Sequence, residues 1–133
     1  MTNVPEQLRY AKTHIWVRDE EDGSLTVGIT DHAQKLLGDL VYVELPTPGQ
    51  NVKIGEEIAV VESVKAASDV YSPVTGEVID VNGTLSDAPE LINSDPYGEG
   101  WIMRVHPLEP ILDDILINAS AYAELVISES EEE

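Results

Sequence analysis

Two similar β segments on either side of a single lysine constrain the fold of this chain more than any other feature. A Gly-Glu pair at residues 55–56 precedes an apolar run at 58–61, and a second Gly-Glu pair at 76–77 precedes another run at 78–81. Lys65 lies close to midway between them. Short β units of this kind cannot each bury a face alone. We therefore expect two packed sheets or a flattened barrel, with Lys65 on an exposed connecting turn.

The segments around this repeat also indicate short strands. Two apolar runs, at 10–17 and 25–29, flank an acidic turn and predict a β-hairpin. Further extended segments are predicted at 40–45 and 52–55, and a last strand at 101–105. Phe is absent from the chain, so the core must be built mainly from Val, Ile, Leu and Ala, a mixture that favours β structure.

Helices are predicted at two places. A short helix over residues 32–37 follows the second strand, with Asp31 before it able to cap its first amides and Gly38 as a stop. Apolar residues, including Leu116, then recur at helical spacing between 111 and 126, with Asn118 or Ser120 as an intervening cap. We therefore expect C-terminal helices that cover the sheet.

Length, composition and charge limit the kinds of protein that this chain can be. A chain of 133 residues that is 42% hydrophobic fits one domain over residues 1–133, with an N-terminal extension over about 1–8 and a flexible acidic tail over about 128–133. Its formal net charge of −19 disfavours nucleic acid and anionic membranes and favours basic partner surfaces. The chain has no cysteine, and its histidines show no metal-ligand spacing. The N-terminus lacks signal features, so we expect a cytoplasmic bacterial protein, with a mature mitochondrial form as an alternative.

Lys65 is the candidate functional residue. Most exposed lysines on turns serve solubility alone. Here the neighbours Ala66 and Ala67 are small, and Glu62 and Asp69 stand at nearly matched distances around the lysine, so an enzyme could recognise the site. Residues 63–66 contain no Gly, Asn or Pro, which favours a type I turn over a primed hairpin turn.

The residues around this lysine resemble the lipoylation segment of glycine cleavage H-proteins. The resemblance extends in order along nearly the whole chain. It rests on the blocks at 62–66, 69–73 and 76–78, and on those at 10, 14–17, 27–34, 37–39, 43–46, 89–93 and 96–101. The family implies a barrel-sandwich hybrid, a mainly β fold with small helices.

By this resemblance, the Lys65 ε-amine forms an amide with lipoate (N6-lipoyllysine), and the chain is a carrier without catalytic activity. The implied partners are glycine decarboxylase (P-protein), aminomethyltransferase (T-protein), dihydrolipoamide dehydrogenase (L-protein) and a lipoyl ligase or transferase. The lipoyl arm would carry the aminomethyl group from the decarboxylase to the aminomethyltransferase, and a monomer suffices for that role.

In this family the loaded arm folds back against the carrier, near the helix that bears His32 and the first strand. Glu62, Ser63, Asp69 and His32 are therefore candidate contacts of the arm. One position departs from the family pattern, because Ile15 replaces a carboxylate that could hold the cationic aminomethyl amine.

Three alternatives remain at this stage. An H-like protein could relay lipoate to other lipoylated proteins, and the Ile15 departure keeps that hypothesis open. A biotinyl carrier would share the hairpin lysine but typically has Met on both sides of it, where this chain has Val64 and Ala66. An enzyme is disfavoured, because the chain has no nucleophile elbow and no phosphate-binding glycine loop.

Overall fold

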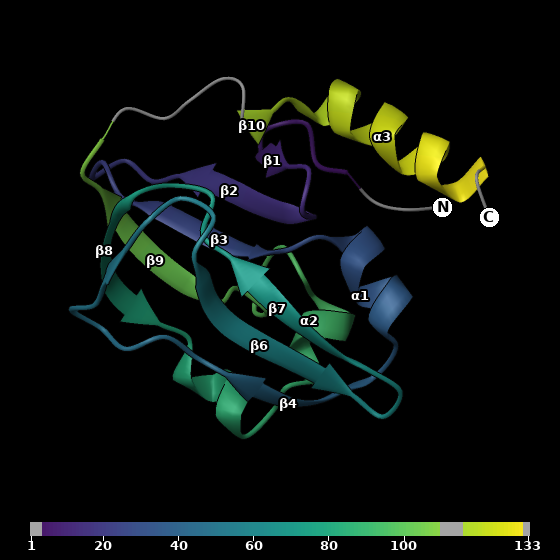
Figure 1. Cartoon of the computed structure of the whole chain (residues 1–133), viewed down its shortest axis with the longest axis horizontal. Helices are drawn as coiled ribbons and strands as arrows, with labels where there is room; N and C mark the ends of the chain where they lie inside the picture. Colours follow the sequence, from purple (N-terminus) through teal and green to yellow (C-terminus); the bar gives the residue numbers. More distant parts are fainter. Residues whose placement is uncertain (1–3, 110–115, 132–133) are drawn as a thin grey trace.

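The computed structural model describes residues 4–109 and 116–131, the side chains of 129–131 excepted. Within these ranges the protein is mainly β, and its strands form two sheets (Figure 1). In order across the larger sheet, the strands are β10 (Leu116–Ile117), β1 (Arg9–Ala11), β2 (Ile15–Asp19), β3 (Leu25–Ile29), β9 (Met103–Pro107), β8 (Gly76–Val81) and β5 (Asn51–Val52). In order across the smaller sheet, they are β4 (Leu40–Glu44), β6 (Glu57–Ser63) and β7 (Ala67–Tyr71). All pairings between neighbouring strands are antiparallel.

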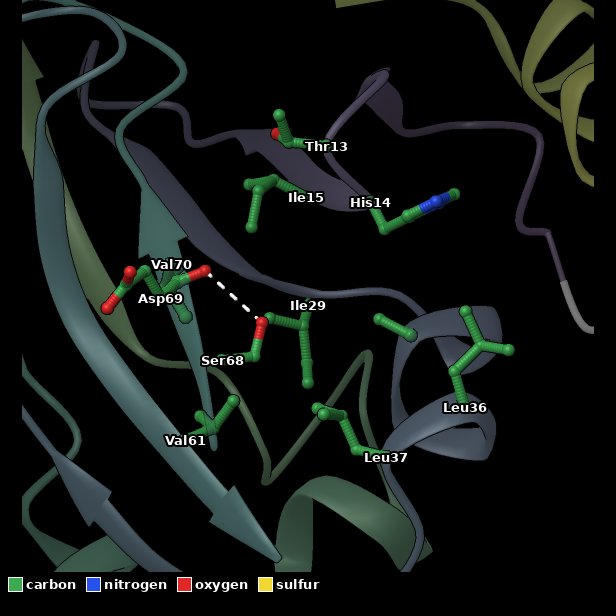
Figure 2. A pocket seen from close by; sticks show the side chains of 11 residues that line it. Thr13, His14, Ile15, Ile29, Leu36, Leu37, Val61, Ser68, Asp69 and Val70 are labelled. Atoms are coloured by element: carbon green, nitrogen blue, oxygen red, sulfur yellow. Dashed lines mark hydrogen bonds between the residues drawn. The ribbon is translucent and has the colours of Figure 1, made fainter. Parts of the chain in front are cut away.

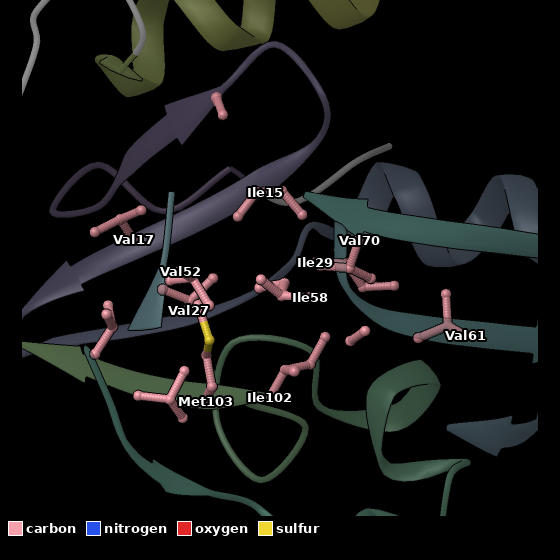
Figure 3. Close-up of a cluster of buried hydrophobic side chains, with 14 of the residues drawn as sticks. Ile15, Val17, Val27, Ile29, Val52, Ile58, Val61, Val70, Ile102 and Met103 are labelled. Atoms are coloured by element: carbon pink, nitrogen blue, oxygen red, sulfur yellow. The ribbon is translucent and has the colours of Figure 1, made fainter. Parts of the chain in front are cut away.

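The main core lies between the two sheets and is built from Val, Ile, Leu, Ala and one Met. Figure 3 shows side chains of both sheets meeting there, among them Ile29 of β3 and Val70 of β7. The two half-units of the sequence repeat contribute to different sheets, since β6 belongs to the smaller sheet and β8 to the larger one. The expected packing of two sheets is confirmed, and it makes β6 and β7 a hairpin with Lys65 in its loop.

The N-terminal hairpin differs in one respect from the prediction. Residues 12–14 form a turn that divides the predicted first strand into β1 and β2, and His14 in that turn has φ = 69°. Consequently α1 (Asp31–Leu37) follows the third strand, not the second. Its end at Gly38 is as predicted, whereas its N-cap is Thr30, whose Oγ1 accepts the Ala33 amide hydrogen at 3.2 Å.

The short helices η1 (Gly83–Ser86) and α2 (Leu91–Ser94) lie between β8 and β9. The predicted strand at 101–105 is displaced, since β9 begins at Met103, and it is not the last strand. Leu116, predicted to be helical, lies in β10, where it pairs with Ala11 of β1. The predicted helical residues 111, 112 and 115 lie outside the described residues.

One helix, α3 (Ala119–Glu131), ends the described part of the chain. Asn118 accepts the Ala121 amide hydrogen through Oδ1 at 2.9 Å, as expected of a cap. The helical backbone extends beyond residue 128, where the sequence suggested a flexible tail. Tyr122 and Val126 pack with Leu8, Tyr10 and Trp16 in a second cluster, so α3 covers the larger sheet on the side away from β6 and β7 (Figure 1). None of the described helices has the length and apolar character needed to cross a membrane.

Candidate functional site

The loop between β6 and β7 presents Lys65 at the end of a hairpin, below α1 in the view of Figure 1. The Ser63 amide donates to the Ala66 carbonyl at 2.7 Å, and the Ser63 hydroxyl accepts from the amides of Lys65 and Ala66 at 3.3 and 3.1 Å. In the described ranges, His14 is the one non-glycine residue with positive φ, so none of residues 63–66 has the positive φ that a type I′ turn requires. This agrees with the prediction that the loop is not a primed turn. Ser63 therefore fixes the turn with its side chain and leaves the lysine side chain outside it.

The Lys65 amine is accessible. Both Lys65 and its neighbour Val64 are exposed, Val64 at 85% of its surface. No salt bridge to Lys65 occurs within the described part of the chain. The stem of the side chain passes over the end of α1, because a Cβ added to Gly38 would lie 3.3 Å from Lys65 Cε. The lysine is thus at the surface and directed across α1.

A pocket of about 120 Å³ lies beside this path, and we call it the α1 pocket (Figure 2). Its walls come from the β1–β2 turn, β3, α1 and the β6–β7 hairpin. It is lined by Thr13, His14, Ile15, Ile29, Ala33, Leu36, Leu37, Val61, Ser68, Asp69 and Val70. Most of these side chains are aliphatic, so the pocket suits an uncharged, apolar group.

Anchors at both ends of α1 fix the wall that it contributes. At its start, the Asp31 amide donates to the Tyr97 hydroxyl at 3.0 Å, and burial raises the pKa of Tyr97 to about 12. At its end, Asn93 Nδ2 donates to the Gly38 carbonyl at 2.9 Å, while Asn93 Oδ1 accepts the Leu40 amide hydrogen at 2.9 Å. These bonds hold α1 in position against α2 and β4.

The structure separates the residues that the sequence grouped as arm contacts. Asp69 lines the α1 pocket, but its carboxylate is directed away from the aliphatic side chains in Figure 2. Ser63 is used in the turn, and Glu62 is half-buried in β6 between Tyr42 and Ala67. His32 is buried on α1, and its ring centroid lies 4.8 Å from that of His14. Of these candidates, only Asp69 lies on the pocket wall beside the lysine.

Several residues at the site were not singled out by sequence reasoning. Thr13 and Ser68 bring hydroxyls to the pocket, and Leu36 and Leu37 form its helical wall. Aliphatic residues such as Leu36 and Leu37 are typical of a hydrophobic core, so no sequence signal marked them as pocket residues. Ile15 stood out in the sequence because it replaces a carboxylate of the family pattern. The structure places it on the pocket wall with 2% of its surface exposed.

A β-rich domain that presents an accessible lysine on a protruding hairpin, next to an apolar pocket, has the features of a carrier with a cofactor attached through that lysine. The family profile of glycine cleavage H-proteins matches residues 8–129. The chain belongs to this family. Its predicted barrel-sandwich fold and its role as a lipoyl carrier of the glycine cleavage system are thereby confirmed.

Individual relatives agree over nearly the full length. Glycine cleavage system H proteins of Shewanella sp. (strain W3-18-1) and Shewanella baltica (strain OS185) are each 57% identical, over 129 and 126 residues. The alignments cover 97% and 95% of this chain, and 100% and 98% of the relatives. The crystal structure of a glycine cleavage system H protein from Mycobacterium marinum has a TM-score of 0.84 at 39% identity, covering 91% of this chain and 97% of that one.

Proposed function

We propose that Lys65 is the residue that carries lipoate and that the lipoyl arm rests in the α1 pocket between transfers. The observation that carries the proposal is the exposed Lys65 side chain, which crosses Gly38 toward the helix that forms one pocket wall. An amide at this amine would leave the core intact. The arm would remain free to reach other proteins.

The other lysines are poorer candidates. Lys35 is held in an ion pair with Asp31 at 3.3 Å, one turn earlier on α1. Lys12 and Lys53 are exposed, but neither lies in the β6–β7 loop nor lines the α1 pocket. Lys53 is the useful comparison, since it also lies in a turn that leads into β6.

The chemistry of the attached group fits the pocket. An ATP-dependent lipoyl ligase first joins the lipoate carboxyl group to AMP and releases pyrophosphate. The Lys65 amine then displaces AMP to form the amide, which removes the lysine charge. Bound there, lipoate provides the dithiolane that accepts the aminomethyl group, sulfur chemistry that a chain without cysteine does not have. The aliphatic walls from Ile15, Ile29 and Val70 would shelter the neutral arm from water.

The same walls predict weaker shelter for the arm loaded with a cationic aminomethyl group. Ile15 places an aliphatic side chain on the wall, and the Asp69 carboxylate is directed away from it. An ammonium group placed against these aliphatic walls loses hydration without gaining an anionic partner. We therefore expect the loaded arm to be held less well than the oxidised arm.

The partners in this proposal are the glycine decarboxylase, the aminomethyltransferase and the dihydrolipoamide dehydrogenase, and catalysis belongs to them. The net charge of −19 suits docking on basic surfaces around their active sites, where complementary charge speeds encounter. Because the relatives are bacterial, we place this function in the bacterial cytoplasm.

Intact-mass measurement tests the attachment site. The protein is incubated with lipoate, ATP and a lipoyl ligase, and we expect the mass of one added lipoyl group. Lys65→Arg should remain folded and unmodified, whereas Lys53→Arg, the matched control, should be modified like the wild type. Lipoylation of Lys65→Arg would show that another amine is the acceptor.

Docking of the arm is tested separately with octanoate as the substrate of the same ligase. Octanoyl-lysine retains the apolar chain and lacks the sulfur atoms. We expect NMR shifts in the methyl groups of Ala33, Ile29 and Val70 on octanoylation, since these lie in the pocket. Shifts confined to residues 63–67 would contradict docking and leave the attachment site unaffected.

A further inference from the structure

A buried tyrosine outside the α1 pocket connects two of its walls. Tyr122 lies on α3, has 0% of its surface exposed, and is absent from the pocket lining. Its hydroxyl oxygen lies 2.7 Å from Thr30 Oγ1 and 2.8 Å from His14 Nδ1. Thr30 and His14 are far from Tyr122 in sequence. The Tyr122 hydroxyl therefore links α3 both to the β1–β2 turn and to the start of α1.

Each of these partners is connected to a different pocket wall. His14 of the β1–β2 turn lines the pocket itself, between Thr13 and Ile15, the first residue of β2. Thr30 is the N-cap of α1, and its Oγ1 also accepts the amide hydrogen of Ala33, a residue of the helical wall. The Thr30 amide donates to the His14 carbonyl at 3.1 Å. The Tyr122 hydroxyl therefore bonds to both sides of the junction between the two walls.

The conformation of His14 shows why this junction needs support. Its φ of 69° is a left-handed conformation, which is unfavourable for a residue with a Cβ and persists where surrounding contacts hold it. The side-chain contact to Tyr122 and the backbone bond from Thr30 are two such contacts. Without the hydroxyl, the β1–β2 turn would lose one of them.

We propose that Tyr122 is a positioning residue for the α1 pocket: its hydroxyl holds the β1–β2 turn and the start of α1 at the spacing that admits the lipoyl arm. The effect of this spacing on the arm rests on the proposed docking of the arm. The hydrogen bonds of the Tyr122 hydroxyl do not depend on that docking. The C-terminal helix, none of whose described side chains lines the pocket, thereby contributes to shelter of the arm.

The chain contains a matched control for this hydroxyl. Tyr10 is also fully buried and stacks on Tyr122, with ring centroids 4.6 Å apart and an interplanar angle of 9°. Its hydroxyl donates to the Pro5 carbonyl at 2.6 Å, away from the α1 pocket. Tyr122→Phe and Tyr10→Phe each remove one buried hydroxyl and keep the same ring stack. A difference between them at the pocket therefore reports the Tyr122 bridge.

The first measurement is amide hydrogen exchange in the protein without an arm. In Tyr122→Phe we expect the Thr30 and Ala33 amides to exchange about fivefold faster, the size of effect that the loss of one buried hydrogen bond produces. Tyr10→Phe should leave both rates within about twofold of the wild type. Thr30→Ser, which keeps the hydroxyl and the cap, should behave as Tyr10→Phe does. Equal rates in Tyr122→Phe and Tyr10→Phe would overturn the bridge.

The second measurement is the octanoylation shift of the pocket methyl groups in the same variants. We expect Tyr10→Phe to retain the wild-type shifts and Tyr122→Phe to lose more than half of their magnitude. Full retention in Tyr122→Phe would overturn the positioning role. Absence of the shifts in the wild type would contradict docking of the arm. The exchange rates of the Thr30 and Ala33 amides would then be the sole test of the Tyr122 bridge.

Discussion

Replacement of Gly38 by alanine perturbs the residue at which α1 ends and over which Lys65 passes. Gly38 has φ = 86° and ψ = −163°, and its amide donates to the Gln34 carbonyl at 3.0 Å. This conformation belongs to a region that glycine occupies almost alone. A side chain there costs about 1–3 kcal/mol in backbone strain. The substitution also reduces the entropy of the unfolded chain, which offsets about 0.4–1 kcal/mol.

Contact with Lys65 is the smaller effect of the same substitution. The new Cβ would lie 3.3 Å from Lys65 Cε, near the end of a flexible and exposed side chain that can move away. We therefore expect backbone strain to dominate, with a net loss of about 1–2 kcal/mol in the free energy of unfolding. For a domain of this size, the midpoint of thermal unfolding should fall by roughly 3–8 °C.

Thermal unfolding followed by circular dichroism checks this magnitude, and a double-mutant cycle with Lys65→Ala checks its cause. If strain dominates, Gly38→Ala should cost nearly the same in both backgrounds, with a coupling energy below about 0.5 kcal/mol. Because the amine stays exposed, lipoylation of Gly38→Ala should proceed as in the wild type. An unchanged midpoint, or a loss that disappears in the Lys65→Ala background, would refute the reasoning.

Three further perturbations test other parts of the site. Ser63→Ala removes the acceptor of two turn amides, so urea unfolding should show a loss of about 1 kcal/mol, and unchanged exchange at Ala66 would contradict that role of the hydroxyl. Ile15→Glu buries a carboxyl group where 2% of the side chain is exposed, and we expect a loss of about 3 kcal/mol. Because burial raises the pKa of such a carboxyl group, that loss should be larger at about pH 8 than at about pH 5, and equal losses would show that the carboxylate reaches solvent. Burial raises the pKa of Tyr97 from 10.0 to about 12, so its contribution to stability is present below pH 10 and lost as the pH rises toward 12. Tyr97→Phe should therefore move the midpoint of alkaline unfolding upward, measured by tryptophan fluorescence, and an unmoved midpoint would assign the transition to other groups.

Local patterns predicted most of the elements that build the site. The two Gly-Glu pairs predicted β6 and β8, but not β7, the strand that directly follows the Lys65 loop. Gly38 predicted the end of α1, because turn and cap chemistry depends on neighbouring residues. The β-branched runs likewise located β3 and β4. The errors occurred where the local signal is short or ambiguous. β10 has only two residues, and Leu116 fits a helical period as well as a strand.

The α1 pocket could not be predicted in the same way, because its walls come from residues far apart in sequence. Thr13 and Ser68 carry no signal that they face the same pocket, and the hydroxyl of Tyr122 reaches Thr30 across 92 positions. The family resemblance supplied the lysine and the expectation of shelter, but not the contacts of each side chain. Only the fold shows that Asp69 lines the pocket, that Ser63 is engaged in the turn and that His32 is buried outside the pocket lining.

The modest size of the α1 pocket suits a carrier of the proposed kind. Each methylene of an arm that leaves water contributes about 0.8 kcal/mol, so two buried methylenes would favour the docked arm by roughly tenfold. A partner must supply the same free energy to withdraw the arm into its own active site, and contacts with an acidic carrier can supply it. Burial of the whole arm would multiply this cost and slow every transfer. A pocket of about 120 Å³ with aliphatic walls therefore offers shelter that a partner can reverse.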